Sequence, residues 1–473
     1  MTSTKTNNHE ALQHKLRIIE RQFGSKLQYE YEFTSIPLRL LRSYKSKLID
    51  SYCHEYVEKV YRDIENRWLS SQDDIDFFID ELRAFGGQLL DQIVPEGLQR
   101  VLWDNRNLID NIILISDEPS YIPWELIHLK PPGIKKLPNE ICFLGQMGLV
   151  RWLSPESSGY LPLDYLKVRR QRAYGIFPSY PSPYQLPQIQ KECDFLTDKF
   201  QITLVEPRQN PVRDLIKKGE FDLLHFAGHG IADLDKASSS MLMLQGCLQS
   251  NDSYKKEFFR AVLVQQFFEK QEKKNLPIVV LNACQVGKSI QTFMGMGGFA
   301  KAFVEGGVGA FIAPLWSIRD KSARKFVESL YDELSQGRNL STATNLARNF
   351  AQKEGDGTWL AYAVYGHPYL KVDFGNKAEP EINYAIVQLE LLIKDNLDIG
   401  EYDKRDGLEI LDELKKGLGF FKDKVPKYKV DIAHQVHKIR RWEFSIQQEI
   451  SVEAFENISK HVYFIVNFLT DFF

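Results

Sequence analysis

The chain has 473 residues, a length typical of about three structural units. Hydrophobic residues make up 43% of it and charged residues 26%, which excludes a disordered or collagen-like chain. Its 60 Lys and Arg residues nearly balance 63 Asp and Glu residues, which argues against a dedicated nucleic-acid binder.

The five cysteines are scattered and form neither a CxxC pair nor a cluster with histidines. This pattern argues against a disulfide framework or a zinc site and fits a reducing compartment. The N-terminus shows no apolar signal segment, and no apolar run reaches the ~18 residues that a membrane span needs. We therefore expect a cytoplasmic protein that has no membrane span and does not contact nucleic acid directly.

The chain divides by pattern into a polar segment, a mixed region and a region of regular alternation. Residues 1–24 are polar and predicted to be loose, whereas residues 25–170 mix helical with extended stretches, including a strand at 108–116. From 171 to 376, strand and helix signals alternate, which predicts an α/β core with a mainly parallel sheet and helices on both faces. Strands are expected at 172–178, 201–205, 221–227, 241–244, 275–282 and 308–314, and helices at 187–200, 212–218, 298–305 and 321–335. Asp320 is predicted to cap the last of these helices.

Residues 377–473 carry no strand signal. Apolar residues recur there at helical spacing in four stretches, 384–396, 406–421, 428–450 and 452–472. We expect a separate all-α domain, and we interpret it as a regulatory module that binds a protein partner.

Two motifs directly follow strands of the predicted core, LHFAGHG at 224–230 and VLNACQVG at 280–287. In open α/β sheets, the functional crevice lies beyond the carboxyl ends of the strands. If the two strands are neighbours, His229 and Cys284 face one cleft. A thiolate is the nucleophilic form of cysteine, and an imidazole can take the thiol proton and later protonate a leaving amine.

The glycines of the first motif have a separate expected task. Gly228 and Gly230 are predicted to let the backbone turn sharply and approach a substrate. The backbone N–H groups of Gly230 and Cys284 are predicted to form an oxyanion hole, where one donor is typically worth about 3–4 kcal/mol. His225 lies on the strand itself, and we interpret it as structural.

The alternative to a nucleophile is a cysteine that only packs, since a cysteine at a strand end is more often inert. The presence of a histidine motif 55 residues upstream favours the catalytic interpretation, because caspases place their histidine roughly 50 residues before the cysteine.

Six segments carry a family resemblance. They are IPWELIHL at 122–129, LPQIQKE at 186–192, FDLLHFAGHG at 221–230, VVLNACQVG at 279–287, GMGGFAKAFVEGGVGAFIAPLWSIRD at 295–320 and WLAYAVYGHP at 359–368. In this order, they resemble the CHAT domain, a caspase-like (clan CD) family of cysteine peptidases. The resemblance implies a catalytic His229 and Cys284 that hydrolyse peptide bonds without a metal or other cofactor. It also implies a latent enzyme activated by a partner or signal, with a role in bacterial defence.

The chain departs from the family pattern in two respects. The pentapeptide that surrounds the caspase nucleophile is absent, so aspartate specificity is not carried over. The tetratricopeptide repeats that often accompany CHAT domains are also missing, and the C-terminal helical region stands in their place.

Four further residues are candidates for the substrate cleft. Trp316 and Ser317 follow the strand expected at 308–314, although plain packing is the alternative for both. Asn282 lies two residues before Cys284 and so on the same side of the strand end, where a local backbone hydrogen bond is the alternative. Asp233 follows the histidine motif, where a solvated loop is the alternative.

These observations predict a caspase-like cysteine endopeptidase that acts on a protein substrate. The first alternative is a catalytically silent CHAT-fold scaffold within a multi-protein complex. The second is a cysteine-dependent acyl hydrolase or transferase that acts on a small molecule.

Overall fold

The structure is a computed structural model, and it divides the chain into two units, Met1–Phe374 and Gly375–Phe473. The described residues are 14–50, 57, 59–60, 63–64, 75–109, 111–116, 122–138, 140–153, 165–231, 240–248, 254–268, 276–284, 297–316, 318–353, 357–374, 386, 389–390, 392–394, 400–420, 429–447 and 450–471. Among them, no helix is both long and apolar enough to cross a membrane.

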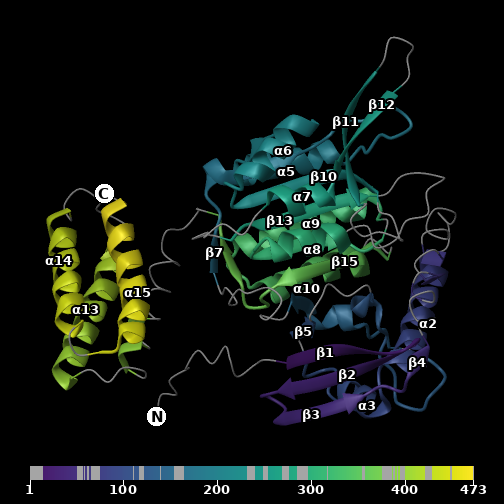
Figure 1. The fold of residues 1–473 in the computed structure, drawn as a ribbon, viewed down its shortest axis with the longest axis horizontal. Helices are drawn as coiled ribbons and strands as arrows, with labels where there is room; N and C mark the ends of the chain where they lie inside the picture. Colours follow the sequence, from purple (N-terminus) through teal and green to yellow (C-terminus); the bar gives the residue numbers. More distant parts are fainter. Residues whose placement is uncertain are drawn as a thin grey trace. The chain divides into compact units, whose positions relative to one another are not determined.

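A 14-stranded sheet runs through the described part of the first unit (Figure 1). Its main path is β12-β11-β10-β13-β14-β15-β6-β5-β1-β2-β3, with β8 beside β10, β9 beside β8 and β4 beside β2. The bounds are β1 His14–Phe23, β2 Lys26–Ser35, β3 Leu40–Lys45, β4 Ile49–Asp50, β5 Ile112–Ser116, β6 Val150–Leu153, β8 Ala173–Ile176, β9 Thr203–Leu204, β10 Leu223–Ile231, β11 Met241–Leu248, β12 Tyr254–Arg260, β13 Ile278–Cys284, β14 Ala310–Pro314 and β15 Tyr362–Gly366. A separate pair joins β7 Tyr165–Lys167 to β16 Lys371–Asp373.

The centre of the sheet is parallel, since β8, β10, β13 and β14 run in one direction. Successive strand residues pack into different cores because side chains alternate between the faces of a sheet. Leu223 and Ile278 belong to one hydrophobic core, whereas Leu224 and Val279 belong to the other. The first core includes residues of α5 Ile189–Phe200, α9 Asp320–Ser335, α10 Leu340–Gln352 and α11 Thr358–Ala361, and the second includes residues of α6 Gln209–Lys218, α7 Ala261–Phe267 and α8 Gly297–Glu305.

The region before the parallel core contains strands that the sequence analysis missed. Part of the segment predicted to be loose is in fact β1, which pairs with β2 along its whole length. Leu16 and Ile18 alternate with more exposed residues and are buried, which is the period-two pattern of a half-buried strand. Helices α2 Ile75–Ile93 and α3 Glu96–Asp104 follow, and their side chains contribute to the same core.

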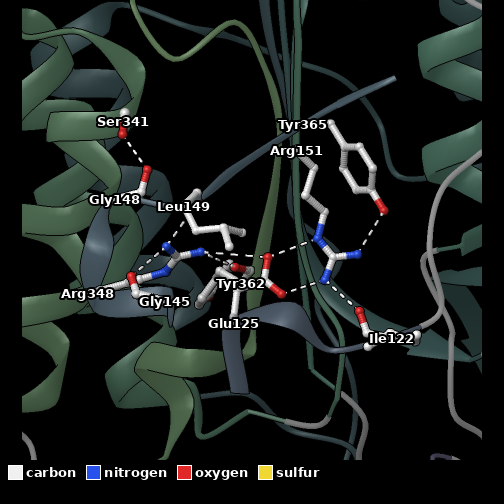
Figure 2. Close-up of polar contacts among 10 residues, drawn as sticks. All are labelled: Ile122, Glu125, Gly145, Gly148, Leu149, Arg151, Ser341, Arg348, Tyr362 and Tyr365. Carbon is white, nitrogen blue, oxygen red and sulfur yellow. Dashed lines mark hydrogen bonds and ion pairs between the residues drawn. The ribbon is translucent and has the colours of Figure 1, made fainter. Parts of the chain in front are cut away.

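The two halves of the sheet meet at β6 and β15, which share the register pair Tyr365↔Arg151. Here Arg151 donates from Nε and Nη2 to the carboxylate of Glu125, and Arg348 lies beside them (Figure 2). None of these three residues is more than 1% exposed. Arg348 on α10 donates to three backbone carbonyls, those of Gly145, Leu149 and Tyr362. Burial lowers the pKa of Arg348 to about 10. We call Glu125, Arg151 and Arg348 the arginine cluster.

The second unit is helical, with α13 Glu401–Phe420, α14 Lys429–Ile446 and α15 Val452–Asp471, and the described residues 386, 389–390 and 392–394 are helical as well. Its own core contains Leu411, Trp442 and Val462. The expected fold class is thus confirmed, an α/β core with a mainly parallel sheet covered by helices and a C-terminal all-α region.

Candidate active site

The histidine motif and the cysteine motif lie at the carboxyl ends of two neighbouring parallel strands, β10 and β13. Strands β10 and β13 pair in register from Leu223↔Ile278 to His229↔Cys284. His229 and Cys284 are therefore directly opposite each other in the ladder, at the carboxyl end of each strand's paired segment. The run IVVLNAC forms the central strand because β-branched and apolar residues suit a strand buried on both faces.

Strand β10 changes its other neighbour just before His229. Its first half pairs with β8 as far as Phe226, and its last residues, from His229 onward, pair with β11. The phenol of Tyr180, in the loop after β8, lies at this change of partner. Its hydroxyl donates to the Met243 carbonyl oxygen at 2.6 Å and accepts from the His229 backbone N–H at 3.2 Å.

Gly228 lies within β10, so the predicted sharp turn at this residue is wrong. The glycine is required for another reason. A Cβ at position 228 would stand 2.6 Å from the Tyr180 hydroxyl and 2.8 Å from the Phe226 ring. The close approach of the Tyr180 and Phe226 side chains therefore explains why a glycine stands at position 228, and its backbone conformation does not. Gly230 is likewise a strand residue and pairs with Leu242.

The imidazole of His229 is held in one orientation by the loop after β8. It is 2% exposed, packs against the Tyr180 ring at 4.6 Å, and its Nε2 lies 2.7 Å from the Tyr184 carbonyl oxygen. A carbonyl oxygen only accepts, so Nε2 must carry the hydrogen. In the neutral imidazole, Nδ1 is then the nitrogen that can take up a proton.

The same loop is tied down at both ends. Phe177 stacks on the His225 ring at 5.5 Å, and the backbone N–H of Gln188 donates to Asp320 Oδ2 at 2.8 Å. The predicted cap role of Asp320 is therefore wrong, because α9 begins at Asp320 after the cap residue Arg319 and the side chain serves the loop instead. Burial raises the pKa of Asp320.

A buried polar network lies on the face of the sheet that positions 229 of β10 and 284 of β13 share. Glu192 of α5 is 2% exposed, and its carboxylate accepts from His225 Nε2 at 2.7 Å and from Asn282 Nδ2 at 2.9 and 2.8 Å. Tyr331 lies 3.1 Å from His225 Nδ1, and the Tyr362 hydroxyl donates to Asn282 Oδ1 at 2.7 Å. We call these five residues the Glu192 network.

The donors to Glu192 have a fixed direction, because the carboxylate can only accept from His225 Nε2 and Asn282 Nδ2. Burial, reinforced by the charge of Glu192, raises the pKa of Tyr331 well above its usual value, so the phenol stays protonated beside His225 Nδ1. The charge of Glu192 also contributes to raising the pKa of Glu328 and Asp320 on α9, after the larger effect of burial.

The remaining predicted site residues are placed as follows. Asn282 is 4% exposed, and both ends of its amide are bonded within the Glu192 network. Trp316 is 5% exposed and belongs to the hydrophobic core. Ser317 and Asp233 lie outside the described residues, so their place in a cleft stays a prediction, as does the oxyanion hole at Gly230 and Cys284.

Sequence reasoning missed Tyr184 and Glu192. Tyr184 acts through its backbone carbonyl, which no side-chain pattern reveals. Glu192 ends the segment LPQIQKE that contributed to the family resemblance, yet nothing in that segment linked it to His225 or Asn282. A buried carboxylate on the apolar face of an amphipathic helix was the available signal, because charged residues rarely take such positions unpaired.

No group of three or more His, Cys, Asp or Glu side chains suited to a metal occurs among the described residues. Two solved structures of the Saccharomyces cerevisiae separase–securin complex contain a chain similar to this one, at 10% and 11% sequence identity and a TM-score of 0.42 in both cases. Each match covers 76% of this chain and 30% of the other, so the chain spans less than a third of the length of these relatives. No curated protein matches the chain.

The family comparison concerns the region that holds the two strand ends. Residues 177–370 match the CHAT domain family. This segment begins at the loop that holds His229 and includes α5, β10 and β13. The resemblance to the CHAT domain is thus confirmed for residues 177–370, which contain five of the six motifs and are similar to this family.

Proposed function

We propose that the protein is a caspase-like cysteine endopeptidase in which Cys284 is the nucleophile and His229 the general acid and base. The observation that carries this proposal is the register pair His229↔Cys284 at the ends of adjacent parallel strands. It is supported by the bond from His229 Nε2 to the Tyr184 carbonyl, which leaves Nδ1 as the basic nitrogen.

The reaction proceeds by acyl transfer. His229 Nδ1 takes the proton of the Cys284 thiol, and the thiolate attacks the carbonyl carbon of the scissile peptide bond. Backbone N–H groups near Gly230 and Cys284 stabilise the oxyanion that forms. The protonated imidazole then gives its proton to the departing amine, and water releases the acyl group from the sulfur with His229 as base.

The burial of His229 supports a latent enzyme. Its side chain is 2% exposed, so a peptide can reach the imidazole only after a rearrangement. We assign the trigger to a protein partner that binds the C-terminal helical unit, and the setting to a cytoplasmic defence response in bacteria, as the family resemblance implies.

The test is reaction of the protein with a peptidyl acyloxymethyl ketone in a bacterial lysate that supplies the binding partner, followed by mass spectrometry that resolves each cysteine. We expect modification of Cys284 that is lost in Cys284→Ala and falls at least tenfold in His229→Ala. The other described cysteines provide an internal reference. Burial raises the pKa of Cys142 to about 11 and also raises that of Cys193, so both thiols should react slowly.

Matched controls use exposed residues of the same types, Cys247→Ala and His437→Ala, which should leave the modification of Cys284 unchanged. Mapping of new N-termini after incubation with a bacterial lysate then identifies the substrate. Modification of Cys284 without any new N-terminus would favour the small-molecule acyl hydrolase. Absence of modification in the presence of the binding partner would favour the silent scaffold and contradict the proposal.

A further inference from the structure

A single buried carboxylate contacts both strands that carry the proposed catalytic pair. Glu192 bonds His225 on β10 and Asn282 on β13, which lie four residues before His229 and two residues before Cys284. Because side chains alternate along a strand, positions 225, 227 and 229 share one face of β10, and positions 280, 282 and 284 share one face of β13. The contacts of Glu192 are therefore on the face of the sheet to which His229 belongs.

The network is an unusual way to fill this space. Removing a carboxylate from water costs several kcal/mol, and hydrophobic side chains of similar volume that replace such a buried group together with its partners are often neutral or stabilising. Apolar neighbours surround the site, including Leu196 on the next turn of α5 and Leu223 on β10. Stability alone therefore does not account for a carboxylate here.

Every polar atom around the carboxylate is oriented by it. The His225 ring is fixed between Glu192 and Tyr331, and the Asn282 amide is fixed between Glu192 and Tyr362. A shift of one strand along the other would break at least one of these bonds, since the two arms reach different strands. The network thus opposes sliding of β10 past β13, the motion that would separate residue 229 from residue 284.

We propose that Glu192 is a positioning residue for the reaction proposed above, and that its carboxylate, through His225 and Asn282, fixes the two strand ends relative to each other. This inference rests on the proposed function, because it requires His229 and Cys284 to react as a pair. Glu192 does not touch the reacting atoms. Its effect is on the distance and angle between imidazole and thiol, and a misplacement of about 1 Å between reacting groups can lower a rate by about 100-fold.

The test compares Glu192→Gln with Asp194→Asn, an equivalent loss of charge at an exposed position on the same helix. In Glu192→Gln, the side-chain amide places an N–H group next to His225 and Asn282, whose donors need an acceptor. We expect kcat on the mapped peptide to fall by about 100-fold with KM within about twofold. The rate of iodoacetamide modification at Cys284, measured from pH 6 to 9, should fall about tenfold at pH 7, with its midpoint moved toward that of a free thiol. Asp194→Asn should match the wild type in every measurement.

A second variant that keeps the negative charge separates a loss of positioning from a loss of folding. Glu192→Asp retains an acceptor but is one methylene shorter, so it cannot reach both strands in the same way, and its rates should lie between those of wild type and Glu192→Gln. If both variants melt earlier yet match the wild-type kcat and Cys284 reactivity at a temperature where they are folded, the role is only structural and the inference is wrong. If Cys284 of the wild type reacts no faster than Cys284 of His229→Ala, the proposed function itself fails and the inference with it.

Discussion

Two of the carboxylates that the first unit buries, Glu125 and Glu192, have different surroundings. Glu125 faces two arginine side chains, with Arg151 in direct contact and Arg348 at 4.0 Å. Glu192 receives its hydrogen bonds from an imidazole and an amide. The arginine cluster contains one carboxylate and two guanidinium groups. It lies where the halves of the sheet are joined by the register pair Tyr365↔Arg151. The Glu192 network lies along the two strands that end at the proposed catalytic pair.

The difference shows that the partners of a buried glutamate decide whether it connects distant elements or aligns two strands. Arginine stays charged and reaches several acceptors at once, which suits a permanent connection between elements distant in sequence. An imidazole on one strand and an amide on the other fix direction, which suits the alignment of two strands. Tyr362, a member of the Glu192 network, also contacts the arginine cluster, because its carbonyl accepts from Arg348 and its hydroxyl donates to Asn282. The comparison predicts that damage to the arginine cluster lowers stability first, whereas damage to the Glu192 network lowers reactivity first.

The largest expected effect on stability is that of Glu125→Gln. The substitution leaves Arg151 and Arg348 buried without a counter-charge, which should lower the free energy of unfolding by about 3–5 kcal/mol. Urea denaturation measures the change. The matched control is Glu140→Gln, whose carboxylate pairs with Arg106 and is 47% exposed, so its loss should stay below about 1 kcal/mol. Equal losses in the two variants would contradict the assigned weight of the arginine cluster.

A pH effect of intermediate size belongs to His128, which lies in the same segment as Glu125. Burial, reinforced by the nearby cations Arg83 and Lys130, lowers the pKa of His128 to about 4. An unperturbed histidine titrates near 6.5, so between these values the unfolded chain binds a proton that the folded chain does not. Stability from this group is complete above pH 6.5 and is lost as the pH falls to about 4, by roughly 3 kcal/mol.

The check is the slope of unfolding free energy against pH between 4 and 6.5. His128→Gln should remove most of this contribution to the slope, whereas His437→Gln, at an exposed position of the helical unit, should leave the slope unchanged. A slope that is the same in wild type and His128→Gln would show that this histidine binds its proton equally in the folded and the unfolded chain, and would contradict the prediction.

The smallest expected change in stability is that of Tyr362→Phe, which removes one hydroxyl and leaves the stacked contact with Phe326, at 3.7 Å between ring centroids. Asn282 Oδ1 loses its donor, at a cost of about 1–2 kcal/mol. The rate of Cys284 modification should fall as well. Tyr365→Phe breaks only a 3.4 Å bond to Arg151 and should leave that rate unchanged. Equal rates in the two variants would remove the distinction between the two clusters.

Much of the fold followed from local patterns, and the failures have physical causes. The apolar run at β13 and the helical spacing of α14 and α15 were readable because burial on both faces and burial on one face leave distinct periods. The hairpin of β1 and β2 was missed, although its charged residues, such as Arg17 and Glu32, lie at the more exposed positions of a regular alternation. The partner of β1 on its other side, β5, lies far along the chain, and local pattern does not reveal that pairing.

The candidate site was predictable in its two motifs and not in its supports. His229 and Cys284 stand out because each follows a strand, and strand ends of a parallel sheet meet at one edge. The anchor of the imidazole is a main-chain atom of Tyr184, and the bridge between the strands is a helix residue 33 positions before His225. Contacts of these kinds depend on how loops and helices pack, which spacing along the sequence does not encode.

The contact between Gly228 and the Tyr180 hydroxyl has a consequence for protein engineering. Any attempt to graft the histidine and cysteine motifs onto another parallel sheet must include the preceding loop, because that loop supplies the phenol at 2.6 Å from the Met243 carbonyl and the carbonyl that orients His229. The shortest transplantable piece therefore runs from residue 177 to residue 284. A donor fragment cut closer to the motifs would carry the imidazole into its host without its anchor.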